Sequence, residues 1–132
     1  PCLLGLEGPI ADELKRLELA DVAAENGRVY FTGNDAALAR ANINLRIGER
    51  VLVELGRFDA LSFDQLFEGT KALPWESLLP KDAAFPVKGY SLNSRLFSVS
   101  DCQKIIKKAI AGRMKSVYGI GWCPETGPLY QV

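Results

Sequence analysis

Residues 88–110 read "KGYSLNSRLFSVSDCQKIIKKAI", and the second half of this stretch has the pattern of an amphipathic helix. At about 100° per residue, one sector collects Cys102, Ile105, Ile106, Ala109, Ile110, Met114 and Val117. The opposite sector collects Ala111 and four lysines, here called the lysine stripe: Lys104, Lys107, Lys108 and Lys115. The pattern predicts a helix from about 101 to 116 with its apolar face on a core and the lysine stripe in solvent.

The start of this helix offers a second feature. Ser100 is predicted to cap the helix, with Gln103 placed to complete a capping box. Free amides at the helix start, close to polar side chains, would suit a phosphate group. Local capping and turn formation explain the hydroxyls equally well. The polar side chains in question are Ser91, Asn93, Ser94 and Arg95.

One cation in the helix breaks the pattern. Arg113 falls among the apolar residues, so either the helix frays near Gly112 or the Arg113 side chain reaches out to the surface.

Residues 1–58 predict a small α+β unit. Pro9 suits the first position of a helix, and Asn26-Gly27 predicts a hairpin with a type I′ turn. A second helix is expected from a cap at Asn34 or Asp35 to Gly48. The alternation of "ERVLVELGRF" then predicts a strand at 49–58, and a first strand ending near residue 3 or 4 would complete a ferredoxin-like βαββαβ unit.

Residues 59–132 predict a second α+β unit. Ser62 and Gln65 form a capping box for a helix that Pro74 ends. Pro86 marks the segment "AFPVKGYSL" as an edge strand or a bulge. The final "LYQV" is predicted to be the start of another strand. Trp75 is expected in the core, whereas Trp122 lies in a glycine-rich loop.

The charge is unevenly distributed along a chain whose formal net charge is zero. The first 66 residues carry 7 basic and 11 acidic side chains, and residues 67–132 carry 9 and 5. Within residues 86–118 there are 7 basic side chains and one acidic one. Such a run is either a solvated helix face or a surface for phosphate backbone.

Several classes of function find no support in the sequence. No apolar run approaches the roughly 20 residues of a membrane helix. His is absent and the three cysteines have no metal-ligand spacing, so no metal site and a reducing, cytoplasmic compartment are expected. No glycine-rich cofactor loop and no nucleophile motif is present, so no catalytic residue is predicted.

Long blocks of the chain resemble one bacterial family. The run at 88–110, with "FEGTKALPWESLLP" before it and "WCPETGPLYQV" after it, resembles the THUMP region of 23S ribosomal RNA methyltransferases. "PCLLGLEGPIADELKRL", "ENGRVYFTG" and "ARANINLRIGERVLVELGRFDALSFDQLFEG" look like the ferredoxin-like N-terminal part of the same family. The resemblance implies a ferredoxin-like unit at 1–58 and a THUMP domain at 59–132 that lacks its last strands. It places the catalytic Rossmann-like domain outside this chain.

The resemblance also implies a function. The family methylates the exocyclic amine of a guanine in 23S ribosomal RNA with S-adenosylmethionine, and many members are labelled adenine-specific DNA methylases. The Asn-Pro-Pro-Tyr-like motif behind that label is absent here. The chain is thus expected to be a non-catalytic region that presents structured RNA to a separate domain. The alternatives are a protein-interaction module and part of a DNA methylase. Charge and geometry predict RNA contacts at Lys88, Ser91, Asn93, Ser94, Arg95, Lys104, Lys107, Lys108 and Lys115.

Overall fold

A computed structural model describes residues 1–91 and 94–132 of the chain. The chain divides into two compact units, Pro1–Val53 and Glu54–Val132, and each unit has its own hydrophobic core. The mixed α+β class is confirmed. None of the helices in the described ranges combines the length and the apolar character that crossing a bilayer requires. The boundary expected between residues 58 and 59 stays a prediction.

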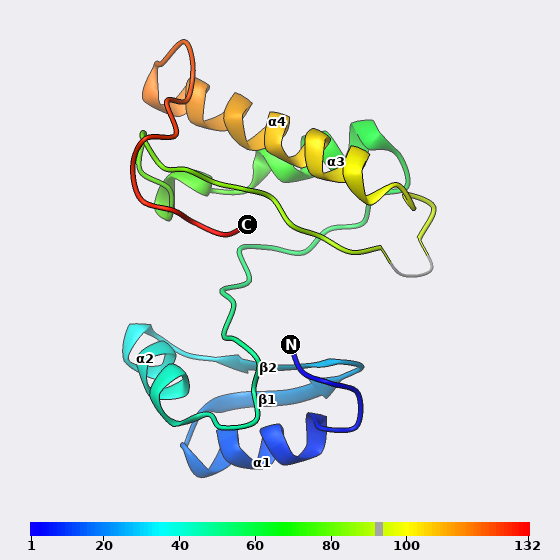
Figure 1. Cartoon of the computed structure of the whole chain (residues 1–132), viewed down its shortest axis with the longest axis vertical. Coiled ribbons are helices and arrows are strands. Elements are labelled where there is room, and N and C mark those ends of the chain that lie inside the picture. The colour runs from blue at the N-terminus through cyan, green and yellow to red at the C-terminus, as the bar shows by residue number, and fades with distance from the viewer. Residues whose placement is uncertain (92–93) are drawn as a thin grey trace. The chain divides into compact units, whose positions relative to one another are not determined.

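The first unit packs two helices on one hairpin (Figure 1). Helix α1 (Glu7–Arg16) precedes the antiparallel strands β1 (Ala20–Glu25) and β2 (Arg28–Thr32), and helix α2 (Asp35–Asn44) follows them. The buried core residues come from both helices and from the connection after α1: Ile10, Leu14, Leu19 and Ala41. The hairpin packs against them with the partly buried side chains Val22, Val29 and Phe31.

The hairpin turn is at Asn26-Gly27, as predicted, but its type is not. Gly27 has a φ of 73°, whereas Asn26 is not among the positive-φ residues of the described chain. A positive φ at the second turn position alone is the requirement of a type II turn, not of type I′. The Glu7 carboxylate accepts the Gly27 N–H at 2.8 Å and the Gly5 N–H at 2.7 Å. These bonds, the Gly27 one first, lower the pKa of Glu7 and tie the turn to the start of α1.

The predicted ends of these two helices need correction. Helix α1 begins at Glu7, so Pro9 lies inside the first turn instead of at the first position. Asn34 caps α2, because its Oδ1 accepts the Ala37 N–H at 3.1 Å. The helix ends at Asn44 and not at Gly48, because Leu45 already adopts an extended conformation with φ −65° and ψ 129°.

The two outer strands predicted for the first unit are absent from the described structure. Cys2 donates one backbone hydrogen bond to Gly27 O at 2.9 Å, and Glu49 donates one to Pro1 O at 3.3 Å. A strand needs a ladder of such bonds, and isolated ones do not form it. Leu52 and Val53 are accordingly exposed, at 61% and 59%, so the alternation that suggested a strand is not used to build one.

In the second unit, helix α3 (Phe63–Ala72) packs directly against helix α4 (Val99–Tyr118) (Figure 1). The short 3-10 helix η1 (Trp75–Ser77) follows α3 in the chain and also contacts α4. The buried core is Trp75, Leu79, Ala83, Phe85, Ile110 and Met114. Trp75 is in this core as predicted, and its indole N–H donates to Thr70 O at 2.7 Å.

The predicted cap of α3 is confirmed. Ser62 Oγ accepts the Gln65 N–H at 3.2 Å. The Gln65 side chain reaches back one residue further than a capping box requires, to the Leu61 N–H at 2.7 Å. The helix ends at Ala72, two residues before Pro74.

Residues 84–88 and 128–132 lie side by side as a parallel pair. Ala84 N–H donates to Pro128 O at 3.0 Å, and Tyr130 N–H donates to Ala84 O at 2.8 Å. The pairing continues from Val132 N–H to Pro86 O at 3.1 Å and from Lys88 N–H to Val132 O at 2.7 Å. Pro86 has no N–H, so one bond of the ladder is missing and only a bridge is formed between Ala84 and Leu129. This is the interruption that Pro86 predicts.

Candidate nucleic-acid interface

Helix α4 supplies most of the predicted interface. It runs from Val99 to Tyr118 and ends at Gly119, whose φ of 63° is the left-handed conformation typical of a helix C-terminus. Its apolar face lies on the core as predicted: Ala109 and Ile110 are fully buried and Met114 is 1% exposed. Val117, which shares the predicted sector, is 46% exposed, whereas its neighbour Tyr118 packs against the core.

Arg113 belongs to neither face. Its guanidinium reaches Glu76 on η1, with Nε 3.0 Å from Oε2 and Nη2 bonded to Oε1. The helix continues unbroken past Gly112, so it does not fray there. The Arg113 side chain, 31% exposed, ends in an ion pair with Glu76 instead of reaching open solvent.

The lysine stripe is not uniformly free in solvent. Lys104 is exposed and pairs with Asp101 one turn earlier, at 3.3 Å. Lys107 is half-buried, with its Nζ 3.0 Å from the Glu125 carboxylate and 5.5 Å from the centre of the Phe85 ring. Lys107 is therefore less exposed than the other lysines of the stripe, because Glu125 in the loop after α4 pairs with it. The exposed part of the stripe is Lys104, Lys108 and Lys115.

A further cation from α3 lies near the stripe. Lys108 Nζ is 6.0 Å from the centre of the Phe67 ring, and Lys71 Nζ is 5.7 Å from the same centre. Phe67 thus attracts one ammonium from each helix to its π-system. Sequence reasoning missed Lys71, although its spacing of four residues from Phe67 on a helix was the available signal.

The start of α4 differs from the predicted phosphate site. The N-cap is Ser98 and not Ser100, and the Ser98 hydroxyl donates to Asp101 Oδ2 at 2.6 Å instead of accepting a backbone N–H. This bond and the Lys104 ammonium lower the pKa of Asp101, so its carboxylate is ionised in the first turn. An anion arriving at these amides would meet a like charge, because Asp101 already occupies the favourable end of the helix dipole.

The predicted polar contacts before α4 are engaged locally. Ser91 Oγ donates to Leu96 O at 2.9 Å, and Ser94 Oγ accepts the Leu96 N–H at 3.1 Å. These bonds correspond to the alternative explanation, in which the hydroxyls shape a turn. Arg95 and Lys88 are exposed, and Asn93 lies outside the described residues.

The loop after α4 lies along the helix. Cys123 Sγ approaches Ala111 O at 4.0 Å, and Glu125 pairs with Lys107 in the same segment. Burial raises the pKa of the Cys123 thiol, an effect that Lys115 opposes. A raised pKa lowers the fraction of the thiol that is present as the nucleophilic thiolate at neutral pH. Within residues 1–91 and 94–132, no cluster of three or more His, Cys, Asp or Glu residues could hold a metal ion.

Two family models match the chain in succession. The model of the RlmL ferredoxin-like domain matches residues 1–52, and the model of the THUMP domain matches residues 60–132. Among curated proteins, "Putative RNA methyltransferase YpsC" of Bacillus subtilis is 43% identical over 98% of this chain. "Ribosomal RNA large subunit methyltransferase K/L" of Cellvibrio japonicus is 27% identical over 90% of it. The chain spans 34% of the first relative and 16% of the second.

Solved structures agree with these matches. A structure described as "a predicted N6-adenine-specific DNA methylase" from Listeria monocytogenes is 50% identical to this chain and superposes with a TM-score of 0.94. The match covers 98% of this chain and 34% of the Listeria chain. A second, described as "a putative methyltransferase complexed with SAH", is 36% identical with a TM-score of 0.92, covering 98% and 35%. The THUMP model alone matches more than half of the sequence. The chain therefore belongs to the THUMP domain family, with an RlmL ferredoxin-like domain at residues 1–52.

Proposed function

We propose that this chain is the RNA-binding, substrate-presenting region of an S-adenosylmethionine-dependent methyltransferase that acts in the cytoplasm on a guanine amine of 23S ribosomal RNA. The observation that carries the proposal is the THUMP domain at residues 60–132, which follows the RlmL ferredoxin-like domain at residues 1–52. A relative named as a ribosomal RNA large subunit methyltransferase and a structural relative complexed with SAH support the reaction and the cofactor.

The charge distribution supports phosphate contacts as the mode of binding. Structured RNA presents a deep, narrow major groove, so proteins recognise it mainly by shape and by its backbone. Lys104, Lys108 and Lys115 repeat along one side of α4 and keep their side chains exposed. Lys88 and Arg95 add exposed cations outside the helix. In the proposal these five residues contact phosphates, while Lys107, Ser91 and Ser94 support the surface through the bonds described above. The earlier expectation for Asn93 stays a prediction.

A DNA substrate is the second candidate, because the Listeria relative is described as a DNA methylase. The two candidates separate in a direct binding experiment. The chain is titrated into a stem-loop RNA taken from 23S ribosomal RNA and into a DNA duplex of the same stem sequence, at the same salt concentration. Tighter binding to RNA supports the proposal, whereas equal or tighter binding to the DNA duplex would contradict it.

The proposal also makes a statement about catalysis. The chain by itself transfers no methyl group and does not bind S-adenosylmethionine, because its sequence has no glycine-rich cofactor loop. Calorimetric titration of S-adenosylmethionine into the chain tests this. Saturable heat of binding would show that a cofactor site lies within these 132 residues.

A further inference from the structure

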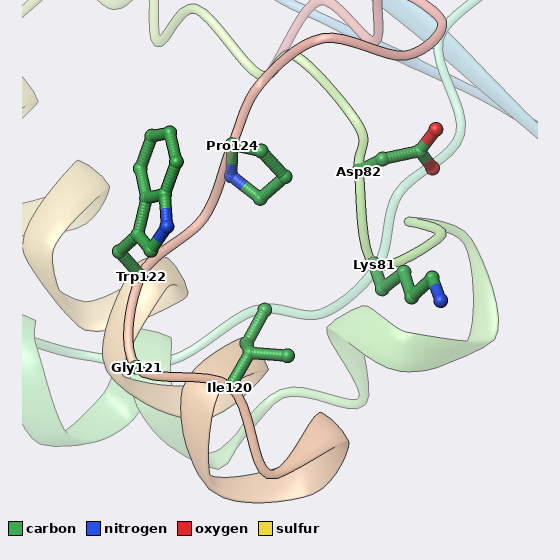
Figure 2. A pocket seen from close by; sticks show the side chains of 6 residues that line it. All are labelled: Lys81, Asp82, Ile120, Gly121, Trp122 and Pro124. Carbon is green, nitrogen blue, oxygen red and sulfur yellow. The ribbon is translucent and has the colours of Figure 1, made fainter.

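The exposed Trp122 side chain forms one wall of a hollow on the surface of the second unit. The Trp122 side chain is 68% exposed, whereas Trp75 is buried in the core with its N–H bonded. The hollow measures about 340 Å³ and is lined by Lys81, Asp82, Ile120, Gly121, Trp122 and Pro124. Figure 2 shows the indole on one side of this space, with the charged ends of Lys81 and Asp82 directed away from it. The interior is therefore apolar, and charge is confined to the rim.

Two chain segments form the walls, and backbone contacts hold them in place. Gly127 N–H donates to Asp82 O at 2.7 Å, which clamps the loop after α4 to the segment before residue 84. Ile120 N–H donates to Lys115 O at 3.2 Å, which fixes the other end of the loop to the last turn of α4. The hollow is therefore built between two anchored segments, with the Trp122 side chain as one of its walls.

Charged side chains of both signs lie around the hollow. Lys81 and Asp82 lie at its rim, and Lys107 and Glu125 form an ion pair in the neighbouring segment. Lys115 is an exposed cation in the last turn of α4, which Gly119 and the loop carrying Trp122 follow. The exposed part of the lysine stripe thus ends where the loop carrying Trp122 begins. A flat aromatic face beside a row of cations is the arrangement that proteins use to bind single-stranded nucleic acid.

We infer that this hollow binds one unpaired RNA nucleotide, with its base stacked on the Trp122 indole and its phosphate directed to Lys81. The inference rests on the proposed RNA-binding function and adds an unpaired nucleotide to it, next to a backbone held by the lysine stripe. Stacking needs only a π-face, so the site accepts any of the four bases. The Phe67 ring is not equivalent, because Lys71 and Lys108 already lie over it.

The test uses the 132-residue chain, a hexa-adenylate RNA and a blunt RNA duplex as probes. Trp122→Ala is expected to weaken hexa-adenylate binding by about 5- to 150-fold, the range of one stacked base. Trp122→Phe keeps an aromatic face and is expected to retain most of the affinity. Lys81→Gln is expected to make the salt dependence of hexa-adenylate binding shallower by about 0.7 in logarithmic slope. Blunt duplex offers no unpaired base, so its binding is expected to be the same in Trp122→Ala and the wild type.

The outcomes separate this inference from the proposed function. If Trp122→Ala binds hexa-adenylate as the wild type does, the stacking site is wrong, while duplex binding that depends on Lys104 and Lys108 still supports the proposed function. If the wild type binds neither RNA, both are wrong. A concentration-dependent blue shift of the tryptophan emission without RNA would show that another copy of the chain covers Trp122, and would also overturn the inference.

Discussion

Arg113 and Glu76 form a bidentate ion pair that connects the second half of α4 to η1. The two side chains are only 31% and 27% exposed, so this pair is better shielded from water than the Lys107–Glu125 pair, at 44% and 33%. Tyr118 adds a hydrogen bond from its hydroxyl to Leu79 O at 2.9 Å. Bidentate Arg–carboxylate bonds fix geometry as well as charge, so Arg113 positions the helix over the core.

Glu76→Gln is expected to lower the stability of the second unit at neutral pH. The hydrogen bond from Arg113 lowers the pKa of Glu76 below its ordinary value of 4.5, as does the charge of Arg113. A carboxyl group whose pKa is depressed in the folded state contributes stability above its unfolded pKa and loses it as pH falls through the folded pKa. The stability difference between wild type and variant should thus be present at pH 7 and shrink as the pH falls from 4.5 through the lower folded pKa of Glu76. Urea unfolding at pH 7 and at a series of pH values below 4.5 measures it.

The control for this prediction is Glu54→Gln. Glu54 pairs with Arg57 at 3.3 Å, but both side chains are about half exposed or more, at 46% and 62%. An exposed pair contributes less than about 1 kcal/mol, so this variant should change stability little at either pH. Equal losses in the two variants at pH 7 would mean that the Arg113–Glu76 bond has no special role.

Ile110→Ala should cost about 2–5 kcal/mol of unfolding free energy, because Ile110 is fully buried in the core of the second unit. Val117→Ala lies on the same predicted face of α4 but is 46% exposed, so its cost should be below about 1 kcal/mol. Ile106 is only half-buried and should fall between the two. Chemical denaturation of the three variants gives the order, and a larger cost at Val117 than at Ile110 would show that the orientation of α4 is wrong.

Local signals in the sequence predicted the helices and the hairpin well. The period of Ile106, Ile110 and Met114 orients α4 correctly, because an amphipathic helix has only one apolar face to bury. Asn34 and Ser62 cap their helices as predicted, and Asn26-Gly27 makes the turn. Each of these signals depends only on residues within a few positions of one another, so it does not depend on how the rest of the chain folds.

The misses arose where the folded geometry decides between alternatives that the local pattern leaves open. Ser98 and Ser100 are equally good caps by composition, and the Ser98 bond to Asp101 decides between them only in the folded geometry. The Lys107 side chain is 44% exposed but pairs with Glu125, which lies 18 residues further along the chain and cannot be found from the helix period. The alternation at 49–58 satisfies a strand pattern, yet no neighbouring strand offers it a ladder of hydrogen bonds. The pattern of one segment does not reveal its partner.

Gly127→Ala is expected to destabilise the second unit by about 1–3 kcal/mol. A Cβ at this position would lie 2.5 Å from Asp82 Oδ2 and 2.9 Å from Asp82 O. The carboxylate can rotate away, but the backbone oxygen accepts the Gly127 N–H and cannot move without breaking that bond. Thermal unfolding followed by circular dichroism measures the loss.

Gly112→Ala is the matched control for the glycine at 127. Its added Cβ meets nothing within 4 Å, and it lies inside α4. Alanine loses less conformational entropy than glycine in a helix, so this variant should gain about 0.5–1 kcal/mol. A loss at 112 as large as that at 127 would mean that the close approach to Asp82 is not the cause.

The exposed lysines of α4 provide the last prediction. Each phosphate neutralised by a lysine releases counterions, so the logarithm of RNA affinity should fall with the logarithm of salt by about 0.7–0.9 per contact. Replacing Lys104 and Lys108 by Gln should therefore weaken binding to structured RNAs and make the slope shallower by about 1–2 units. Stability should change by less than about 0.5 kcal/mol per site, because both side chains are exposed.

The control for the α4 lysines is the double variant Lys15→Gln with Arg16→Gln, which removes two exposed cations from α1. A salt titration of a 23S RNA stem-loop with the wild type and both double variants measures the slopes. If the α4 variant keeps the wild-type slope, or if the α1 variant loses as much, the lysines of α4 are an ordinary solvated face and the phosphate contacts lie elsewhere.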